Sequence, residues 1–312
     1  SSIEKARNYL ADLPAWKYGR AYQIALSALE QAMADIQSQR LGLPFGALFG
    51  SPRRTRIPCY ANINRGTSDR SPEGWATRAQ KAISKGFPAI KIAPFDGVVG
   101  GAEYLKSASF REGVDIIAAV RGSVNSKIDL MLDCHWKFDL NSAISLLDKI
   151  AEYKLAWLEA PIYEDYLAIG DLFKIRRTAN ESGIKLAGGE YLDGVRATSP
   201  FIQSDAYDVI NPDIRLCGVN GSLCIAIDAD SNGIRYAPHN HLGPIMTAVN
   251  LHLMSVAPNA MTLEIQFEEV DTEPKLVPPT LYTPLSGYLD VPQGPGLGVD
   301  VNFEALVNIP LC

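Results

Sequence analysis

The sequence predicts an α/β fold: a TIM-type β/α barrel of seven or eight βα units, with a partial α+β capping domain built from the two ends of the chain. From residue 57 onward, short apolar runs alternate with helix-length amphipathic segments, a pattern typical of βαβ units around a parallel sheet. Eight such runs fall within roughly 210 residues, which favours one closed barrel over two open halves. The two ends of the chain lack this alternation.

Composition and charge exclude several classes of protein. The 312 residues are 47% hydrophobic and 21% charged, which is typical of a soluble globular chain rather than a disordered or fibrous one. The net charge of -6 disfavours nucleic-acid binding. The five cysteines form no C-x-x-C pair, and no apolar run approaches membrane-spanning length. We therefore expect a cytoplasmic protein with no nucleic-acid or membrane partner.

The chain divides into three predicted parts. Residues 1–55 contain one amphipathic helical segment, Tyr22 to Gln39, followed by the Gly- and Pro-punctuated run LGLPFGALFG. Residues 56–270 carry the barrel repeat. Residues 271–312 are rich in Pro and Gly and predict extended chain and turns. We interpret the first part as the helical remnant of a capping domain, and the last part as a segment that packs back on it.

The elements of the barrel follow from hydrophobic periodicity. Eight short apolar runs predict the strands: Ile57 to Ile63, Ala89 to Ile92, Ile128 to Asp133, Ala156 to Glu159, Ile184 to Ala187, Val209 to Asn211, Ile234 to Ala237 and Met261 to Ile265. Segments with helical spacing lie between them: Pro72 to Lys85, Tyr104 to Arg121, Asn141 to Glu152, Tyr166 to Ala179, Gly221 to Asn232 and Pro244 to Val256.

Polar residues stand at the ends of the predicted strands. They are Lys91, Asp133, His135, Glu159, Glu190, Asp213, His239 and Glu264. From Asp133 onward, one such residue per strand recurs after 26, 31, 23, 26 and 25 positions, about one βα unit each time. These side chains should therefore ring the carboxyl-terminal mouth of the barrel, where the active sites of such barrels lie.

Three of these residues are carboxylates on three consecutive strands: Asp133, Glu159 and Glu190. An oxygen-only donor set suits Mg²⁺, which keeps water positions open for substrate oxygens, better than zinc, which favours His or Cys. A single carboxylate at the end of a strand often caps a helix or pairs with an arginine. Three carboxylates at the spacing of one βα unit predict a metal site.

The other strand-end residues predict acid–base chemistry. Asp213 and His239 end consecutive strands, so we expect a hydrogen bond in which the carboxylate orients the imidazole as a base. The alternative is a core histidine and a helix cap. Lys91 as a cation and Glu264 as a proton donor would stabilise negative charge on a substrate carboxylate. Alternatively, Lys91 closes the barrel mouth through an ion pair.

The motifs around these residues occur in the order found in a known family. The stretches are SALEQAMADIQSQRLGLPFGALFG, IKIA, LDCHW, WLEAP, GGE, NPD, APHNHLGPI, LEIQ and GYLDVPQGPGLG, from about residue 20 to the end. They resemble the mandelate racemase subgroup of the enolase superfamily, and most of all its D-galactonate dehydratase-type acid-sugar dehydratases. The resemblance implies an enolase-like barrel, and Mg²⁺ bound by Asp133, Glu159 and Glu190.

The resemblance also implies a reaction: the dehydration of an aldonate or aldarate. The dyad of His239 and Asp213 abstracts the proton α to the carboxylate, giving a metal-stabilised enolate. His135, in the D-x-H run of Asp133-Cys134-His135, then protonates the leaving 3-hydroxyl. The product is a 2-keto-3-deoxy acid, and the substrate is a small anionic sugar acid.

One departure from the family pattern bears on the choice between a dehydratase and the alternative functions. Where the racemases carry K-x-K, this chain has Lys91-Ile92-Ala93, and Ala93 cannot act as the second base. An α-hydroxy-acid racemase or epimerase is therefore the less favoured alternative, and a catalytically silent barrel that binds or supports a partner is another. The His239-x-His241 run resembles a zinc pair, but barrel hydrolases carry that pair on the first strand. His135 could also be structural.

Three further expectations concern what surrounds the site. Trp136, Lys137, Tyr163 and Asn240 flank the predicted mouth and are candidates for substrate selection or for packing. A homo-oligomer is expected. The resembled family has a three-stranded sheet with no counterpart in residues 1–55, so we expect an upstream segment outside this chain, without which the chain could be inactive.

Overall fold

The computed structural model describes residues 19–96, 105–271 and 276–307. The parts of the predicted capping remnant and of the C-terminal segment that fall on 1–18, 272–275 and 308–312 lie outside the described residues. So does the predicted start of one helix at Tyr104.

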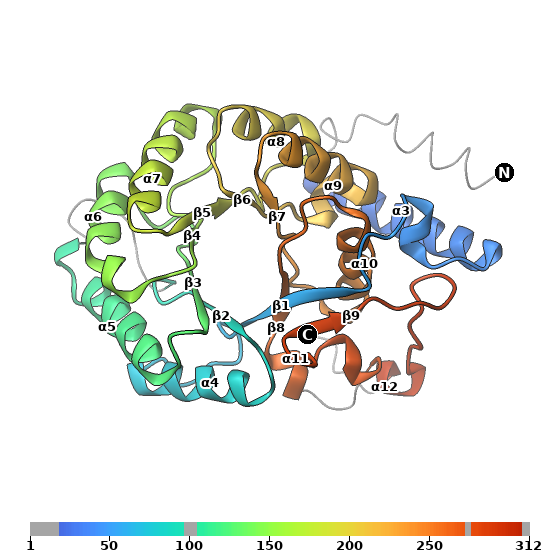
Figure 1. Ribbon diagram of the computed structural model, residues 1–312, viewed down its shortest axis with the longest axis horizontal. Coiled ribbons are helices and arrows are strands. Elements are labelled where there is room, and N and C mark those ends of the chain that lie inside the picture. Colours follow the sequence, from blue (N-terminus) through green and yellow to red (C-terminus); the bar gives the residue numbers. More distant parts are fainter. Residues whose placement is uncertain (1–18, 97–104, 272–275, 308–312) are drawn as a thin grey trace.

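Eight parallel strands form a ring at the centre of the molecule (Figure 1). They are β1 (Arg56–Asn62), β2 (Ala89–Ile92), β3 (Asp129–Asp133), β4 (Trp157–Glu159), β5 (Lys185–Gly188), β6 (Val209–Ile210), β7 (Arg235–Tyr236) and β8 (Leu263–Gln266). Their order is β7-β6-β5-β4-β3-β2-β1-β8. A parallel bridge between Tyr236 and Ala260, just ahead of β8, closes the ring. The eight predicted strands are confirmed, with ends shifted by one or two residues.

Helices surround the ring and follow the strands (Figure 1). They are α4 (Pro72–Ser84), α5 (Ala108–Ser123), α6 (Leu140–Ile150), α7 (Ile169–Glu181), α8 (Gly194–Gln203), α9 (Ile214–Ser231), α10 (Gly243–Val256) and the short α11 (Glu268–Asp271). Three differ from the prediction. Helices α8 and α11 were not predicted, and α8 contains Pro200, a residue that usually breaks helices. Helix α9 begins seven residues earlier than predicted, across a kink at Gly218, where φ is 68°.

The alternation of side chains along each strand builds both the core and the site. On β3, Leu130 and Leu132 face the helices and join the main core, while Met131 faces the inside of the ring. Trp157 of β4 also faces inward. Because alternate strand residues share a face, the residues two positions further along, Asp133 and Glu159, also face inward, at the carboxyl end. An apolar layer therefore lies beneath the charged mouth.

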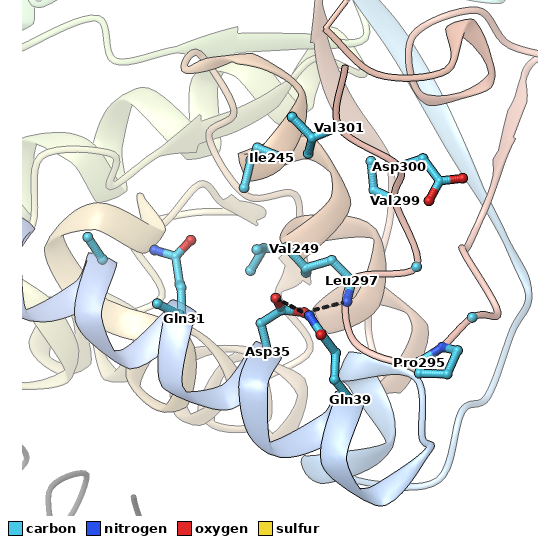
Figure 2. Close-up of a pocket in the computed structure, with 14 residues that line it drawn as sticks. Gln31, Asp35, Gln39, Ile245, Val249, Pro295, Leu297, Val299, Asp300 and Val301 are labelled. Atoms are coloured by element: carbon cyan, nitrogen blue, oxygen red, sulfur yellow. Dashed lines mark hydrogen bonds between the residues drawn. The ribbon is translucent and has the colours of Figure 1, made fainter. Parts of the chain in front are cut away.

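The two ends of the described chain meet on one side of the barrel. Helix α3 (Arg20–Leu41) packs against α9, and β9 (Tyr288–Asp290) pairs antiparallel with β1. Asp35 of α3 accepts a hydrogen bond from the backbone N–H of Leu297 at 2.7 Å (Figure 2). A cavity of about 760 Å³ lies between α3, α10 and this C-terminal segment. It shares no lining residue with the barrel mouth.

Within the described ranges, no helix combines the length and the apolar character needed to cross a membrane.

Helix α5 offers a matched test of how tightly the helices pack on the ring. A Cβ on Gly113 would lie 2.1 Å from Cε1 of buried Phe95, whereas a Cβ on Gly122 of the same helix meets open space. We expect Gly113→Ala to lower the free energy of unfolding by about 1–3 kcal/mol through overpacking. Gly122→Ala should raise it by roughly 0.5–1 kcal/mol through helix propensity. Urea unfolding of both variants measures the difference, and equal effects would contradict the packing described.

Candidate active site

Three buried carboxylates lie together at the carboxyl end of neighbouring strands. Asp133 ends β3 and Glu159 ends β4, and the two are direct partners in the parallel register. Glu190 follows β5 by two residues. Each of the three is at most 6% exposed. The spacing argument from the sequence thus identified side chains that the barrel brings to one place.

Lys91 of β2 lies among these carboxylates. Its Nζ is 2.7 Å from Oε1 of Glu159, 3.2 Å from Oε1 of Glu264 and 3.8 Å from Oδ2 of Asp133. Burial alone opposes a charged lysine, but Glu159 and Glu264 more than offset it and raise the pKa of Lys91 well above its usual value. Lys91 therefore forms the ion pair at the barrel mouth that was predicted as the alternative to a substrate contact.

One lysine does not neutralise the whole cluster. Burial raises the pKa of Glu159 to about 8, because the nearby carboxylates Asp133 and Glu190 add to the effect and Lys91 only partly opposes it. Burial also raises the pKa of Glu190. Oε2 of Glu190 is buried and accepts no hydrogen bond. The mouth therefore carries more buried carboxylate than its own cations satisfy.

His239 lies beside this cluster. Its Nδ1 is 2.9 Å from Oε2 of Glu264 and 3.2 Å from Oε2 of Glu190. Burial disfavours the imidazolium, but these two carboxylates outweigh it and raise the pKa of His239 to about 9. The ring also stacks on that of His241, with 4.4 Å between ring centroids.

Asp213 does not make the predicted hydrogen bond to His239. The two residues are backbone partners in a parallel bridge, but the Asp213 carboxylate turns to the start of α9. There Oδ1 accepts from the backbone N–H of Arg215 at 2.9 Å, and Oδ2 accepts from Nε of Arg215 at 2.8 Å and from its Nη2. A guanidinium two residues along offers a charge-assisted pair together with the helix cap, and it displaces the imidazole as partner.

Glu264 is held as a carboxylate rather than as the predicted proton donor. Burial raises its pKa, but Lys91 and His239 outweigh that effect and hold the pKa well below its usual value. Oε1 accepts from Nδ2 of Asn62 at 2.7 Å, and Oε2 accepts from the backbone N–H of Asn240 at 2.9 Å. Asn240, a predicted candidate for substrate selection, is 2% exposed and supports Glu264 instead.

His135 reaches the cluster by a turn rather than by continuing the strand. β3 ends at Asp133, and His135 has a positive φ of 45°. Its Nε2 lies 3.0 Å from Oδ2 of Asp133, and its Nδ1 contacts Oδ1 of Asp96, which follows β2. The imidazole is therefore held between two carboxylates, one of them in the buried cluster.

A pocket of about 290 Å³ opens onto these groups. It is lined by Asp133, Glu190, His135, His239, Asp213, His241, Asn62, Asn64, Arg65, Trp136, Tyr191, Arg215, Leu216 and Gln266. Asn62, Asp96 and Arg215 act at or beside the site but were not predicted. Asn62 alone carried a usable signal, because it ends β1 as the predicted residues end their strands.

The carboxylate cluster fits a hard cation by the chemistry of its donors. It offers carboxylate oxygens alone, as Mg²⁺ prefers. Oε2 of Glu190 is buried and accepts no hydrogen bond, although the His239 ring lies 3.2 Å away, so it can still serve as a ligand. As the side chains lie in the described ranges, no group of three or more His, Cys, Asp or Glu residues is arranged so that it could hold a metal ion. Lys91 and His135 instead pair with Glu159 and Asp133.

The chain is similar in sequence to known sugar-acid dehydratases. The chain is 28% identical over 286 residues to a D-gluconate dehydratase of Thermoproteus tenax, covering 90% of this chain and 55% of that protein. It is also 28% identical to a D-gluconate/D-galactonate dehydratase of Picrophilus torridus, covering 91% and 71%. The chain thus spans little more than half the length of the first relative.

The chain is also similar to solved structures of the enolase superfamily. A member of the enolase superfamily from Salmonella Typhimurium superposes with a TM-score of 0.81 at 26% identity, over 99% of this chain and 82% of that one. A mandelate racemase/muconate lactonizing enzyme-like protein from Rubrobacter xylanophilus gives 0.82 at 26%, over 92% and 77%. The family model described as enolase C-terminal domain-like matches residues 74–306. The chain therefore belongs to the enolase superfamily, as a member of its C-terminal domain-like family.

Proposed function

We propose that this protein is a Mg²⁺-dependent dehydratase of a sugar acid, an aldonate or aldarate, and that it forms a 2-keto-3-deoxy acid. The observation that carries the proposal is the placement of two histidines on one buried carboxylate cluster. His135 lies on Asp133 and His239 lies on Glu190. Dehydration needs a base for the α-proton and an acid for the departing hydroxyl, and two such histidines can divide these roles. The names of the relatives, dehydratases of gluconate and galactonate, support the same class.

The cation would be held by Asp133, Glu159 and Glu190. When bound, Mg²⁺ supplies Lewis-acid stabilisation of the charge that develops on the substrate carboxylate. Lys91 pairs with Glu159 and Glu264 and contributes a fixed positive charge beside the proposed ligands.

His239 is the proposed base. It acts in its neutral form, because a cation held by Glu190 would offset one of the two negative charges that raise the pKa of this ring to about 9. The neutral imidazole takes the proton from the carbon next to the carboxylate, and the electron pair left behind moves toward the carboxylate oxygens. Glu190 and Glu264 stabilise the imidazolium that results. In this structure these two carboxylates, rather than Asp213, are the partners of the ring, so we assign Asp213 to the start of α9 and to Arg215.

His135 is the proposed acid. It gives its proton to the 3-hydroxyl as the C3–O bond breaks, water leaves, and the enol that remains becomes the 2-keto-3-deoxy acid. Burial lowers the pKa of an imidazole, but Asp133 and Asp96 outweigh this effect and raise the pKa of His135 to about 11. Asp96 is not one of the carboxylates that would hold the cation, so its negative charge still faces the ring with the cation bound and favours the protonated form that the acid requires.

The alternative reactions lack a group that they require. Racemisation needs a base on each face of the substrate carbon, and the second position of the K-x-K run is Ala93, which is buried and has no titratable group. A silent barrel has no need of two histidines at one buried carboxylate cluster. Cytoplasmic location and homo-oligomeric assembly stay as parts of the proposal.

The two histidine roles can be separated by one variant. We expect His135→Asn to retain exchange of the α-proton with D₂O and to lose roughly 10²–10⁴-fold in dehydration. The measurement is a screen of five- and six-carbon aldonates and aldarates with Mg²⁺, following keto-acid product and deuterium incorporation. His239→Asn, the matched change, should lose both activities.

Other outcomes would identify the alternatives. If wild type returned both epimers without loss of water, the racemase reading would replace the dehydratase. If wild type with Mg²⁺ neither exchanged nor dehydrated any sugar acid, the proposed function would be wrong for this chain.

The pKa of His135 can be tested without any substrate. Asp96→Asn removes one of the two carboxylates that raise this pKa, so the pKa should fall from about 11. ¹⁵N-imidazole NMR of the metal-free protein can follow this, since the chain has 4 histidines, and His135→Asn assigns the signal.

The same pair implies a pH dependence of stability. The pKa of His135 in the folded protein is raised above the ordinary value of 6.5. Its contribution to the free energy of unfolding is therefore complete below pH 6.5 and is lost as the pH rises toward 11. The free energies of unfolding of wild type and Asp96→Asn, measured with urea, should therefore differ more at pH 6 than near pH 11. An unchanged His135 titration in Asp96→Asn would show that the contact does not set this pKa.

A further inference from the structure

A buried carboxylate that the proposed reaction does not use joins three segments around the site. Glu164 lies on the loop between β4 and α7 and is 9% exposed. Its Oε1 accepts hydrogen bonds from the Tyr207 hydroxyl at 2.6 Å and from the backbone N–H of Gly189 at 2.7 Å. Its Oε2 accepts from the indole Nε1–H of Trp136 at 3.2 Å.

Two of these three donors adjoin residues of the site. Gly189 immediately precedes Glu190, and Trp136 immediately follows His135. Both Glu190 and Trp136 line the pocket, whereas Glu164 does not. Glu164 therefore does not face the pocket itself; it is linked to the pocket through its hydrogen bonds with Trp136 and Gly189.

The chain after β5 is shaped to admit this carboxylate. A Cβ on Gly188 would lie 2.3 Å from Oε1 of Glu164, so a side chain at that position would displace the carboxylate. Gly189 has a φ of +98°, which presents its N–H to Oε1 and which residues with a Cβ rarely adopt. The Gly188-Gly189 pair thus fits the position of Glu164.

Trp136 is held as a wall of the pocket. Its φ is positive, at 58°, and its backbone N–H donates to the carbonyl of Ala160 at 2.7 Å. Its ring meets that of Tyr191 edge to face, with centroids 4.7 Å apart. The Arg20 guanidinium of α3 lies 4.9 Å from the centroid of Tyr191. The bond to Glu164 fixes the polar edge of the indole.

We propose that Glu164 is a positioning residue, which holds Trp136 as the aromatic wall against which the sugar acid is bound. The part concerning the substrate rests on the proposed function. The part concerning the orientation of Trp136 does not depend on it.

The variant Glu164→Gln removes the hydrogen bond to Trp136 and keeps the hydrogen bonds to Tyr207 and Gly189. The glutamine amide can be oriented in two ways. We expect its oxygen to take the place of Oε1 and to accept from Tyr207 and Gly189, because in the opposite orientation its NH₂ group would face the backbone N–H of Gly189. The amide NH₂ then faces the indole N–H of Trp136, donor against donor. This variant therefore releases Trp136 while it keeps the other two bonds. Glu181→Gln, at an exposed carboxylate of α7, makes the same chemical change away from the site.

The first readout needs no substrate. The fluorescence of Trp136 is obtained as the difference between each protein and its Trp136→Phe counterpart. In Glu164→Gln we expect this difference spectrum to shift to longer wavelength and to be quenched more readily by acrylamide. Glu181→Gln should match wild type. If Glu164→Gln also matches wild type, Glu164 does not hold Trp136 and the proposal is overturned.

The second readout uses the sugar acid that the substrate screen identifies. We expect Glu164→Gln and Trp136→Phe each to raise KM by roughly five-fold or more with kcat within about two-fold of wild type. The double variant should show no further loss, because both changes remove one interaction. Additive losses, or a fall in kcat alone, would contradict the positioning role. If no sugar acid reacts, the proposed function fails, and the fluorescence result still decides the tie between Glu164 and Trp136.

Discussion

The ion pair of Lys91 with the buried carboxylates is the interaction on which the site depends. Lys91 is 1% exposed, and its Nζ lies 2.7 Å from Glu159 and 3.2 Å from Glu264. Taking each such charge out of water costs several kcal/mol, so none of them would be stable alone. The lysine offsets part of the repulsion among the carboxylates. Burial, together with the repulsion that remains, raises the pKa values of Glu159 and Glu190. The barrel mouth is thus built with excess negative charge.

The fold supplies the framework for this cluster. Beneath the charges lies an apolar layer of inward-facing residues, among them Tyr60, Met131 and Trp157. Trp157 also donates its indole N–H to Oε2 of Glu159 at 3.0 Å, so the packing layer orients a carboxylate directly. Asn62 and Asn240 do the same for Glu264. Rigid orientation of this kind lets charged groups act on a substrate without first reorganising.

The parts of this arrangement that follow strand geometry could be predicted from the sequence. A strand has a period of two and a βα unit has a nearly constant length, so the spacing alone brings Asp133, Glu159 and Glu190 to one end of the barrel. What depends on competition between side chains could not be predicted. Nothing in the strand pattern says that Asp213 pairs with Arg215 rather than His239, since that choice is made at the start of α9.

Loop conformation sets the other limit of prediction. β3 ends at Asp133, and His135 contacts Asp133 from a turn in which its own φ is positive. Asp96 and Glu164 lie on loops whose course has no periodic signal, and neither was predicted. The capping domain drawn from both ends stays a prediction. Among the described residues, α3 packs on α9, and the backbone N–H of Leu297 donates a hydrogen bond to Asp35.

The central claim, that the buried carboxylates form a cation site, is tested most directly by titration calorimetry of Mg²⁺ binding near pH 7. Because the pKa of Glu159 is raised to about 8, cation binding should release protons. The heat should then depend on the ionisation enthalpy of the buffer. We expect wild type to bind Mg²⁺ with proton release, and Glu190→Gln to bind at least about ten-fold more weakly. Equal affinity in wild type and Glu190→Gln, or binding without proton release, would contradict the account.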